Sequence, residues 1–217
     1  MTTHQVGSSS DELLGPNSWL NPGLAAYDFR GDVRTSPTAA MLNAITHASL
    51  LDDIDRSDSS TRKLEAYVAS LAGHETGLWV VSGTMGNLVS LRCLLHQPPY
   101  SIMCDERSHC LTNEAGGVFA FAGAIPQPIR PANDKYITLE DILPIIKLGH
   151  GEKVHACPTR VISLENTLRG MVMPLAEARR IGDFAHANGI RVHLDGARLW
   201  EAVASGAGVP RGLLLYF

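Results

Sequence analysis

Runs of apolar residues bounded by glycine and polar turns predict five short strands in this chain. They are expected at residues 77–81, 101–104, 124–130, 159–164 and 190–194. Apolar residues at helical spacing predict helices at residues 38–48, 62–71, 88–95, 138–147 and 174–188. Because strands and helices alternate through the second half, we expect an α/β fold with a mostly parallel sheet flanked by helices. Pro126 and Pro128 place the strand over 124–130 at an edge of that sheet.

The strand over 190–194 ends at Asp195 and Gly196. Open α/β sheets bind ligands beyond the carboxyl ends of their strands. A carboxylate there can keep a cofactor's ring nitrogen protonated, as enzymes that use pyridoxal 5'-phosphate (PLP) require. An aspartate that only caps the next helix is the alternative. Because Ser82, His109 and Asn166 also follow predicted strands, we expect an active site at this end of the sheet.

The segment Ser82-Gly-Thr-Met-Gly86-Asn87 lies between the strand over 77–81 and the next helix. In this arrangement backbone N–H groups and a helix N-terminus can face an anion. The spacing is neither that of a dinucleotide-binding fingerprint nor that of a Walker loop, so nucleotide binding is not indicated. An ordinary tight turn is the alternative.

Composition narrows the class of protein. The chain has 217 residues, 45% of them hydrophobic, and a formal net charge of −4. These values are typical of a packed soluble domain without a basic surface for nucleic acid or membranes. For its cysteines, reduced thiols in a cytoplasmic protein are the expectation. The four cysteines lack a CxxC pair and zinc-ligand spacing, so no metal site is expected. We expect residues 1–23 to be disordered, residues 24–210 to form one domain and residues 211–217 to be an apolar tail.

Five segments occur in an order that resembles low-specificity threonine aldolases. They are Asp28-Phe-Arg30, residues 82–87, Ser108-His109 with Glu114-Ala-Gly-Gly117, Leu164-Glu-Asn-Thr167 and His193-Leu-Asp-Gly-Ala-Arg198. The resemblance covers about residues 27–210. Those enzymes are PLP-dependent members of the β-eliminating lyase superfamily with the aspartate-aminotransferase fold. The resemblance therefore implies the aminotransferase-like large domain, PLP as cofactor and a homo-oligomer for a full-length form.

The resemblance also assigns cofactor contacts to residues that follow the strands. These residues are Ser82, Gly83, Thr84, His109, Asn166, Asp195 and Arg198. Gly83 and Thr84 would hold the phosphate at the helix N-terminus. His109 would stack on the pyridine ring, while Asp195 would pair with the ring nitrogen. Arg198 would lie near the phenolic oxygen and the substrate carboxylate.

The implied reaction is the cleavage of L-threonine or L-allo-threonine to glycine and acetaldehyde. His109 and His155, together with Asp195, are the candidate catalytic residues, and either histidine could exchange the proton of the substrate hydroxyl. A solvated loop histidine is the alternative for His155. Substrate contacts are assigned to Gly31, Glu114 and Arg198.

The sequence departs from the family in three places. The lysine that carries PLP in the family lies beyond the Asp195 motif, whereas the four lysines here, Lys63, Lys135, Lys147 and Lys153, all precede it. We therefore expect a chain truncated before that lysine, with the C-terminal part missing. Gly31 replaces a family serine, and Asp55-Arg56 replaces Tyr-Gly. An inactive remnant or PLP-binding interaction module, and a related lyase for another β-hydroxy amino acid, are the alternatives.

Overall fold

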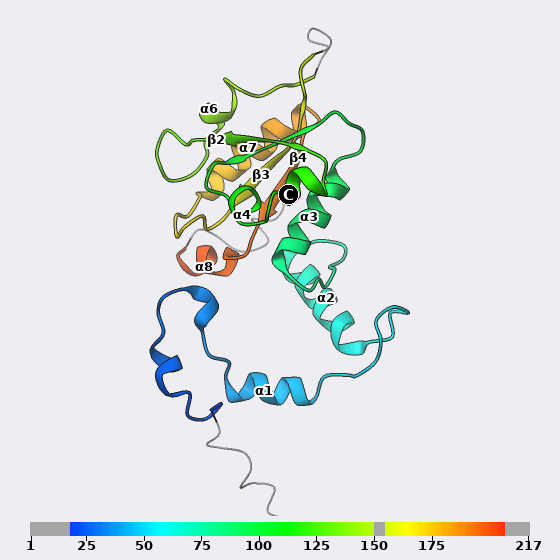
Figure 1. Ribbon diagram of the computed structural model, residues 1–217, viewed down its shortest axis with the longest axis vertical. Helices are drawn as coiled ribbons and strands as arrows, with labels where there is room; N and C mark the ends of the chain where they lie inside the picture. Colours follow the sequence, from blue (N-terminus) through cyan, green and yellow to red (C-terminus); the bar gives the residue numbers. More distant parts are fainter. Residues whose placement is uncertain (1–17, 150–154, 207–217) are drawn as a thin grey trace, which may run out of the picture. The chain divides into compact units, whose positions relative to one another are not determined.

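The computed structural model describes residues 18–149 and 155–206, which divide into two units after Arg62 (Figure 1). The division falls inside the domain expected over residues 24–210. Most of the predicted disordered segment and the whole of the predicted apolar tail lie outside the described residues. No helix in the described ranges is long and apolar enough to cross a membrane.

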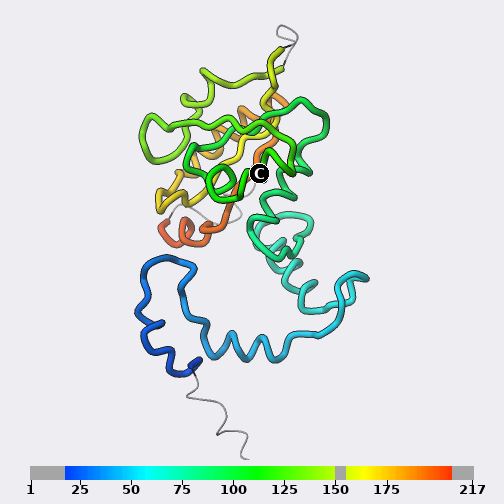
Figure 2. Tube along the Cα trace, in the orientation of Figure 1, coloured from blue at the N-terminus to red at the C-terminus, as the bar shows by residue number. Residues whose placement is uncertain are grey.

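The first unit consists of short helices joined by extended segments (Figure 2). Two 3-10 helices, η1 (Gly23–Tyr27) and η2 (Asp32–Arg34), precede α1 (Ala39–Thr46). Thr38 caps α1, since its hydroxyl accepts a hydrogen bond from the Met41 N–H at 3.3 Å. Helix α2 (Ser59–Ala72) begins in this unit and continues into the next.

The second unit contains a four-stranded parallel sheet in the order β2-β1-β3-β4. The strands are β1 (Ser101–Asp105), β2 (Ile125–Ile129), β3 (Thr159–Glu165) and β4 (Arg191–Asp195). The register pairs Glu165 with Asp195, so the carboxyl ends of β3 and β4 meet. β2, with its two prolines, is an edge strand, as its sequence predicts.

Helices cover both faces of this sheet, and a separate apolar core lies under each layer. On one face, Met103, Ile162 and Val192 pack with α6 (Leu139–Ile142) and α7 (Leu175–Ala187). On the other face, Ile102 and Val161 pack with α3 (Gly83–Leu94), α4 (His109–Thr112) and α5 (Gly117–Ala120). Alternate residues of each strand therefore face opposite cores, which confirms the predicted α/β architecture. Helix α8 (Leu199–Ala204) follows β4.

Helix α6 is shorter than the helix predicted over residues 138–147. It begins as predicted, at a capping box in which Thr138 and Asp141 bond each other's N–H groups. It ends after one turn, at Ile142. Pro144 explains the early end, because proline lacks the N–H donor and its ring clashes with the preceding turn.

The prediction of a buried strand over residues 77–81 is wrong. This segment has no strand pairing, and Leu78 and Val81 are 71% and 87% exposed. Its backbone bonds side chains instead: the Trp79 N–H donates to the Glu65 carboxylate at 2.8 Å, and the Gly77 carbonyl accepts from the Thr76 hydroxyl at 3.3 Å. A strand forms only beside a hydrogen-bonding neighbour, and the described residues provide none for this segment.

Candidate active site

A pocket of about 480 Å³ lies at the carboxyl end of β4, beside the start of α3. Its walls are formed by Gly83, Thr84, Gly86, Asn87, His109, Asp195, Gly196, Ala197 and Arg198. Five of the residues predicted from sequence therefore meet here, although they come from segments more than a hundred positions apart: Gly83, Thr84, His109, Asp195 and Arg198. His109 and Asp195 follow β1 and β4, whose carboxyl ends lie at the same edge of the parallel sheet. Gly83 and Thr84 reach the pocket at the start of α3, although no strand of the described residues precedes them.

The N-terminus of α3 forms one wall of the pocket. The Ser82 hydroxyl caps the helix by accepting a hydrogen bond from the Met85 N–H at 3.1 Å. The first intrahelical bond runs from Gly86 to the Ser82 carbonyl. The N–H groups of Gly83 and Thr84 precede that bond and have no partner within the helix. They can therefore bind an anion in the pocket.

Asp195 is the carboxylate of the pocket. It is the last residue of β4 and is 8% exposed. Oδ1 accepts the Ala197 N–H at 3.1 Å, and Oδ2 accepts the side-chain amide of Asn87 at 2.9 Å. These two bonds fix the plane of the carboxylate, and its remaining lone pairs can accept a proton donor of a ligand.

His109 is held by a second buried carboxylate, Glu114. His109 Nδ1 lies 2.9 Å from Glu114 Oε1, and the Asn87 amide donates to the same oxygen at 2.8 Å. The Glu114 side chain is fully buried, and its other oxygen, Oε2, has no hydrogen-bond partner. Glu114 thus orients the His109 ring and is not among the residues that line the pocket. Its substrate contact stays a prediction.

Glu165 anchors His109 from the neighbouring strand. One of its carboxylate oxygens accepts the His109 backbone N–H at 2.8 Å. Burial, assisted by the nearby charge of Asp195, raises the pKa of the Glu165 carboxyl. No role for Glu165 was predicted from the sequence, although it lies directly before Asn166 at the end of β3. The register that pairs it with Asp195 explains why it reaches this site.

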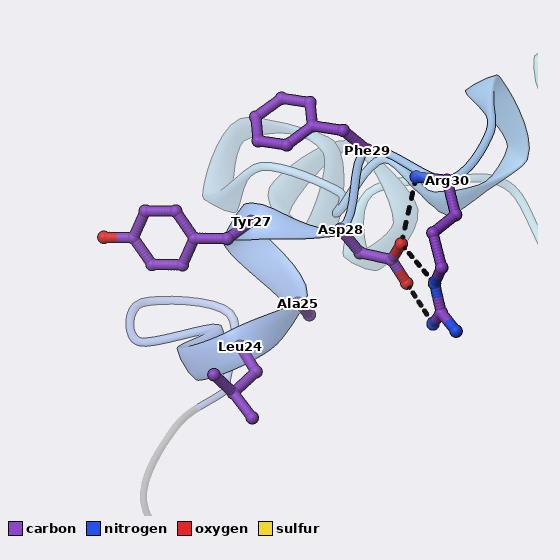
Figure 3. A pocket seen from close by; sticks show the side chains of 6 residues that line it. All are labelled: Leu24, Ala25, Tyr27, Asp28, Phe29 and Arg30. Atoms are coloured by element: carbon purple, nitrogen blue, oxygen red, sulfur yellow. Dashed lines mark hydrogen bonds and ion pairs between the residues drawn. The ribbon is translucent and has the colours of Figure 1, made fainter.

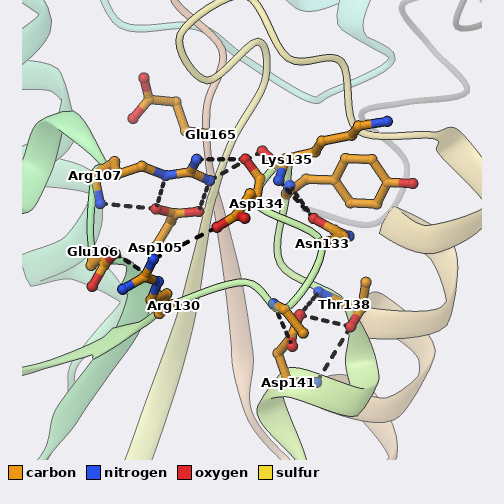
Figure 4. Close-up of polar contacts among 12 residues, drawn as sticks. Asp105, Glu106, Arg107, Arg130, Asn133, Asp134, Lys135, Thr138, Asp141 and Glu165 are labelled. Atoms are coloured by element: carbon orange, nitrogen blue, oxygen red, sulfur yellow. Dashed lines mark hydrogen bonds and ion pairs between the residues drawn. The ribbon is translucent and has the colours of Figure 1, made fainter.

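The carboxyl end of β1 carries a polar cluster of a different kind (Figure 4). The Arg107 guanidinium binds both oxygens of Asp105, at 2.9 and 2.8 Å. The same guanidinium donates to the backbone carbonyls of Asp134 and Lys135. The guanidinium thus holds the loop after β2 to the end of β1, which indicates a structural role for this cluster.

Two further residues predicted for the site, Asn166 and His155, are not among the residues that line the pocket. The Asn166 side chain bonds the backbone N–H and carbonyl of Met173, at 3.1 and 3.2 Å, which commits both ends of its amide to the loop. His155 is exposed and precedes β3, at the end of the strand opposite to the pocket. Gly31 belongs to the first unit, so its role stays a prediction.

The Asp28-Phe-Arg30 segment forms a compact turn in the first unit (Figure 3). Arg30 Nε donates to Asp28 Oδ1 at 2.8 Å, and a terminal guanidinium nitrogen donates to Oδ2 at 2.6 Å. This pair lowers the pKa of the Asp28 carboxyl. Tyr27 and Phe29 point outward on either side of the turn and are 76% and 89% exposed.

Beneath the pocket, β3 and β4 share a buried hydrogen bond. Ser163 Oγ lies 2.9 Å from His193 Nδ1. Burial lowers the pKa of His193 to about 4. The imidazole is therefore neutral at neutral pH, and it belongs to the interior of the sheet.

Two kinds of ligand suit the donors of this pocket. His109, Glu114 and Asp195 offer ligand atoms within 4.8 Å of one another, which is a possible metal set. The two carboxylates, however, already share the N–H groups of Asn87. An anion site beside an imidazole and a carboxylate that can accept a ring N–H fits a phosphorylated heterocycle better.

Comparison with known proteins identifies the family of this chain. The family model of the beta-eliminating lyases matches residues 28–217. The chain belongs to the beta-eliminating lyase family. Over 89% of this chain, the sequence is 50% identical to "Aldolase vrtJ" of Penicillium aethiopicum. It is 46% identical to "Alanine racemase TOXG" of Cochliobolus carbonum over 88% of this chain. It is 45% identical to the low-specificity L-threonine aldolase of Candida albicans over 84% of this chain.

The match to these beta-eliminating lyases concerns one part of them. The chain spans 49% of the length of each of the three relatives. Among solved structures, the threonine aldolase of Leishmania major superposes with a TM-score of 0.67 at 20% identity, over 80% of this chain and 51% of that one. These findings confirm the predicted family and the predicted α/β fold.

Proposed function

We propose that this chain binds PLP in the pocket at the end of β4 and forms the cofactor-binding part of an enzyme that cleaves L-threonine or L-allo-threonine to glycine and acetaldehyde. The observation that carries the proposal is that the Asp195 carboxylate lines the same pocket as the start of α3 and lies within 4.8 Å of a ring nitrogen of His109. Low-specificity L-threonine aldolases of several fungi, 45–47% identical, support the choice of reaction.

The residues of the pocket match the parts of PLP. Gly83 and Thr84 would hold its phosphate through the helix N-terminus. Asp195 would accept the ring N–H, and the His109 imidazole would cover a face of the ring. Bound PLP supplies an electron sink for the amino acid's Cα, which is what cleavage of a bond at that carbon needs.

His109 can also move a proton. The Glu114 oxygen that it contacts already accepts a hydrogen bond from Asn87, so this oxygen is an acceptor and His109 Nδ1 carries the hydrogen. Nε2 is then the ring nitrogen available to a ligand. A histidine fixed in this tautomer can take the proton from a substrate hydroxyl at Nε2.

The relatives keep a second reaction open. One of them is named an alanine racemase and is as similar to this chain as the threonine aldolases are. Racemisation and aldol cleavage both begin with the loss of a group from Cα, so the same cofactor contacts would serve either. Gly31 and Asp55 differ from the residues of threonine aldolases, which leaves a bulkier β-hydroxy amino acid as a further substrate class.

The described lysines, Lys63, Lys135 and Lys147, do not line the pocket. The contacts to PLP from Asp195, His109 and the start of α3 would all be noncovalent. A homo-oligomer and a cytoplasmic location, as expected from the family, are parts of the same proposal.

The test is intact mass after incubation with PLP and borohydride reduction, combined with product assays. Unreduced protein should retain PLP by absorbance, without a specific covalent adduct. Glycine from L-threonine would mean that the chain is itself an aldolase, and interconversion of L- and D-alanine would favour the racemase reaction. Failure to bind PLP in any form would refute the proposal.

Ser82→Asp should separate the stability of α3 from its anion site. Aspartate is as good a cap as serine, so the free energy of unfolding should stay close to that of the wild type. Its negative charge should weaken PLP binding, because it lies beside the proposed phosphate site. Ser82→Ala, in contrast, should lower the free energy of unfolding by about 1 kcal/mol. Urea unfolding and a PLP absorbance titration measure the two effects, and unchanged PLP affinity in Ser82→Asp would contradict the phosphate assignment.

A further inference from the structure

Asn87 links Asp195, the carboxylate of the pocket, to the buried carboxylate of Glu114. It lies one helical turn after Gly83 on α3 and is 8% exposed. Its side-chain nitrogen donates to Glu114 Oε1 at 2.8 Å and to Asp195 Oδ2 at 2.9 Å. An amide nitrogen has two hydrogens, so both are used on carboxylate oxygens.

We propose that Asn87 is a positioning residue, which aims the Asp195 carboxylate at a ring nitrogen in the pocket and couples it to the pair formed by Glu114 and His109. The proposal rests on the proposed function for the identity of the ring, PLP. The coupling between Asn87 and the two carboxylates is independent of the proposed function, because it needs no ligand.

The orientation of the Asn87 amide is determined by its neighbours. If the amide were reversed, its carbonyl oxygen would face two carboxylate oxygens, and no hydrogen bond could form with ionised groups. With the nitrogen inward, a single residue satisfies one oxygen of each carboxylate. The His109 ring, Glu114, Asn87 and Asp195 then form one continuous chain of hydrogen bonds.

Removal of the amide would affect both ends of this chain. The ligand atoms of Glu114 and Asp195 lie within 4.8 Å of each other, and Glu114 Oε2 already lacks a partner. Without Asn87, two buried carboxylates would face each other with no donor between them, and like charges at that distance repel strongly where water is excluded. Of the two bonds that hold the Asp195 carboxylate within the described residues, only that from the Ala197 N–H would remain, which fixes its plane less well.

The ring contact is tested with two ligands, PLP and its carbocyclic analogue in which the ring nitrogen is replaced by C–H. The analogue keeps the phosphate and the ring face but has no N–H for Asp195. We expect Asn87→Ala to lower the preference for PLP over the analogue by about tenfold, which is the scale on which orienting partners act in metal sites. Equal loss of affinity for both ligands, or no loss, would overturn the positioning role.

The coupling is tested without any ligand, by a double-mutant cycle on urea unfolding midpoints. Asn87→Ala and Asp195→Ala should shift the midpoint by amounts that do not add in the double variant. Additive shifts would refute the coupling. Asn188→Ala is the matched control, because its side-chain amide donates one hydrogen bond to the Phe184 carbonyl at the end of α7. It should combine additively with Asp195→Ala. If the wild type binds neither ligand, the proposed function fails while this cycle still decides the coupling.

Discussion

Replacement of Asp195 by alanine is expected to weaken PLP binding by roughly tenfold to hundredfold. The variant removes the acceptor for the ring N–H, and a hydrogen bond to a charged group contributes about 1.5–3 kcal/mol, where 1.4 kcal/mol corresponds to a factor of ten. Asp195 is buried at the end of β4 and is held by Asn87 and Ala197. Fluorescence or absorbance titration of the purified chain with PLP measures the change.

Asp105→Asn is the matched control for this prediction. Asp105 also ends a parallel strand and is 4% exposed, but its two oxygens bind Arg107 and it does not line the pocket. This variant should lower stability, since it leaves a half-buried guanidinium with a poorer partner, and its PLP affinity should stay within about twofold of the wild type. An Asp195→Ala variant that binds PLP as tightly as Asp105→Asn would contradict the assignment of Asp195.

The meeting of Asp195 and His109 in one pocket could be predicted from sequence, because both follow runs of apolar residues. In a parallel sheet, such residues converge whatever the order of the strands. The sheet order itself, β2-β1-β3-β4, could not be read from the pattern, since every strand is a short apolar run of similar length.

The position of Asn87 in the sequence already indicates that its side chain lies near the site. It closes the segment of small residues that begins at Ser82, and its spacing of four from Gly83 places both on one helix face. Its partner Glu114, in contrast, could not be placed from sequence. Glu114 lies in the turn between α4 and α5 and is 4% exposed, and its burial depends on packing between elements that the local sequence does not specify.

The segment over residues 77–81 illustrates the limit of the apolar pattern. Its sequence has the β-branched and aromatic residues of a strand, yet it has no strand partner in the described chain. Strand formation depends on a neighbour that local sequence does not specify. Asn166 is a similar case, because its position after β3 is right for a ligand contact while its amide is used by Met173.

Acidification is expected to destabilise this protein through His193. Burial lowers the pKa of His193 from 6.5 to about 4. Above pH 6.5 the imidazole is neutral in both the folded and the unfolded chain, so its contribution to stability is fully present. As the pH falls from 6.5 to about 4, the unfolded chain binds a proton that the folded chain does not, and the free energy of unfolding should fall by about 3 kcal/mol.

The variant His193→Asn should remove most of this pH dependence. Its amide can still bond Ser163, in place of Nδ1 of the histidine, but it does not titrate. Urea unfolding between pH 7 and pH 4.5 should therefore show a shallower loss of stability than in the wild type. His186→Asn, at an exposed position in the last turn of α7, should keep the wild-type slope. If the free energy of unfolding fell with pH as steeply in His193→Asn as in the wild type, the prediction would be wrong. Protonation of His193 would then carry no cost in the folded sheet, and carboxylates would dominate the response to acid.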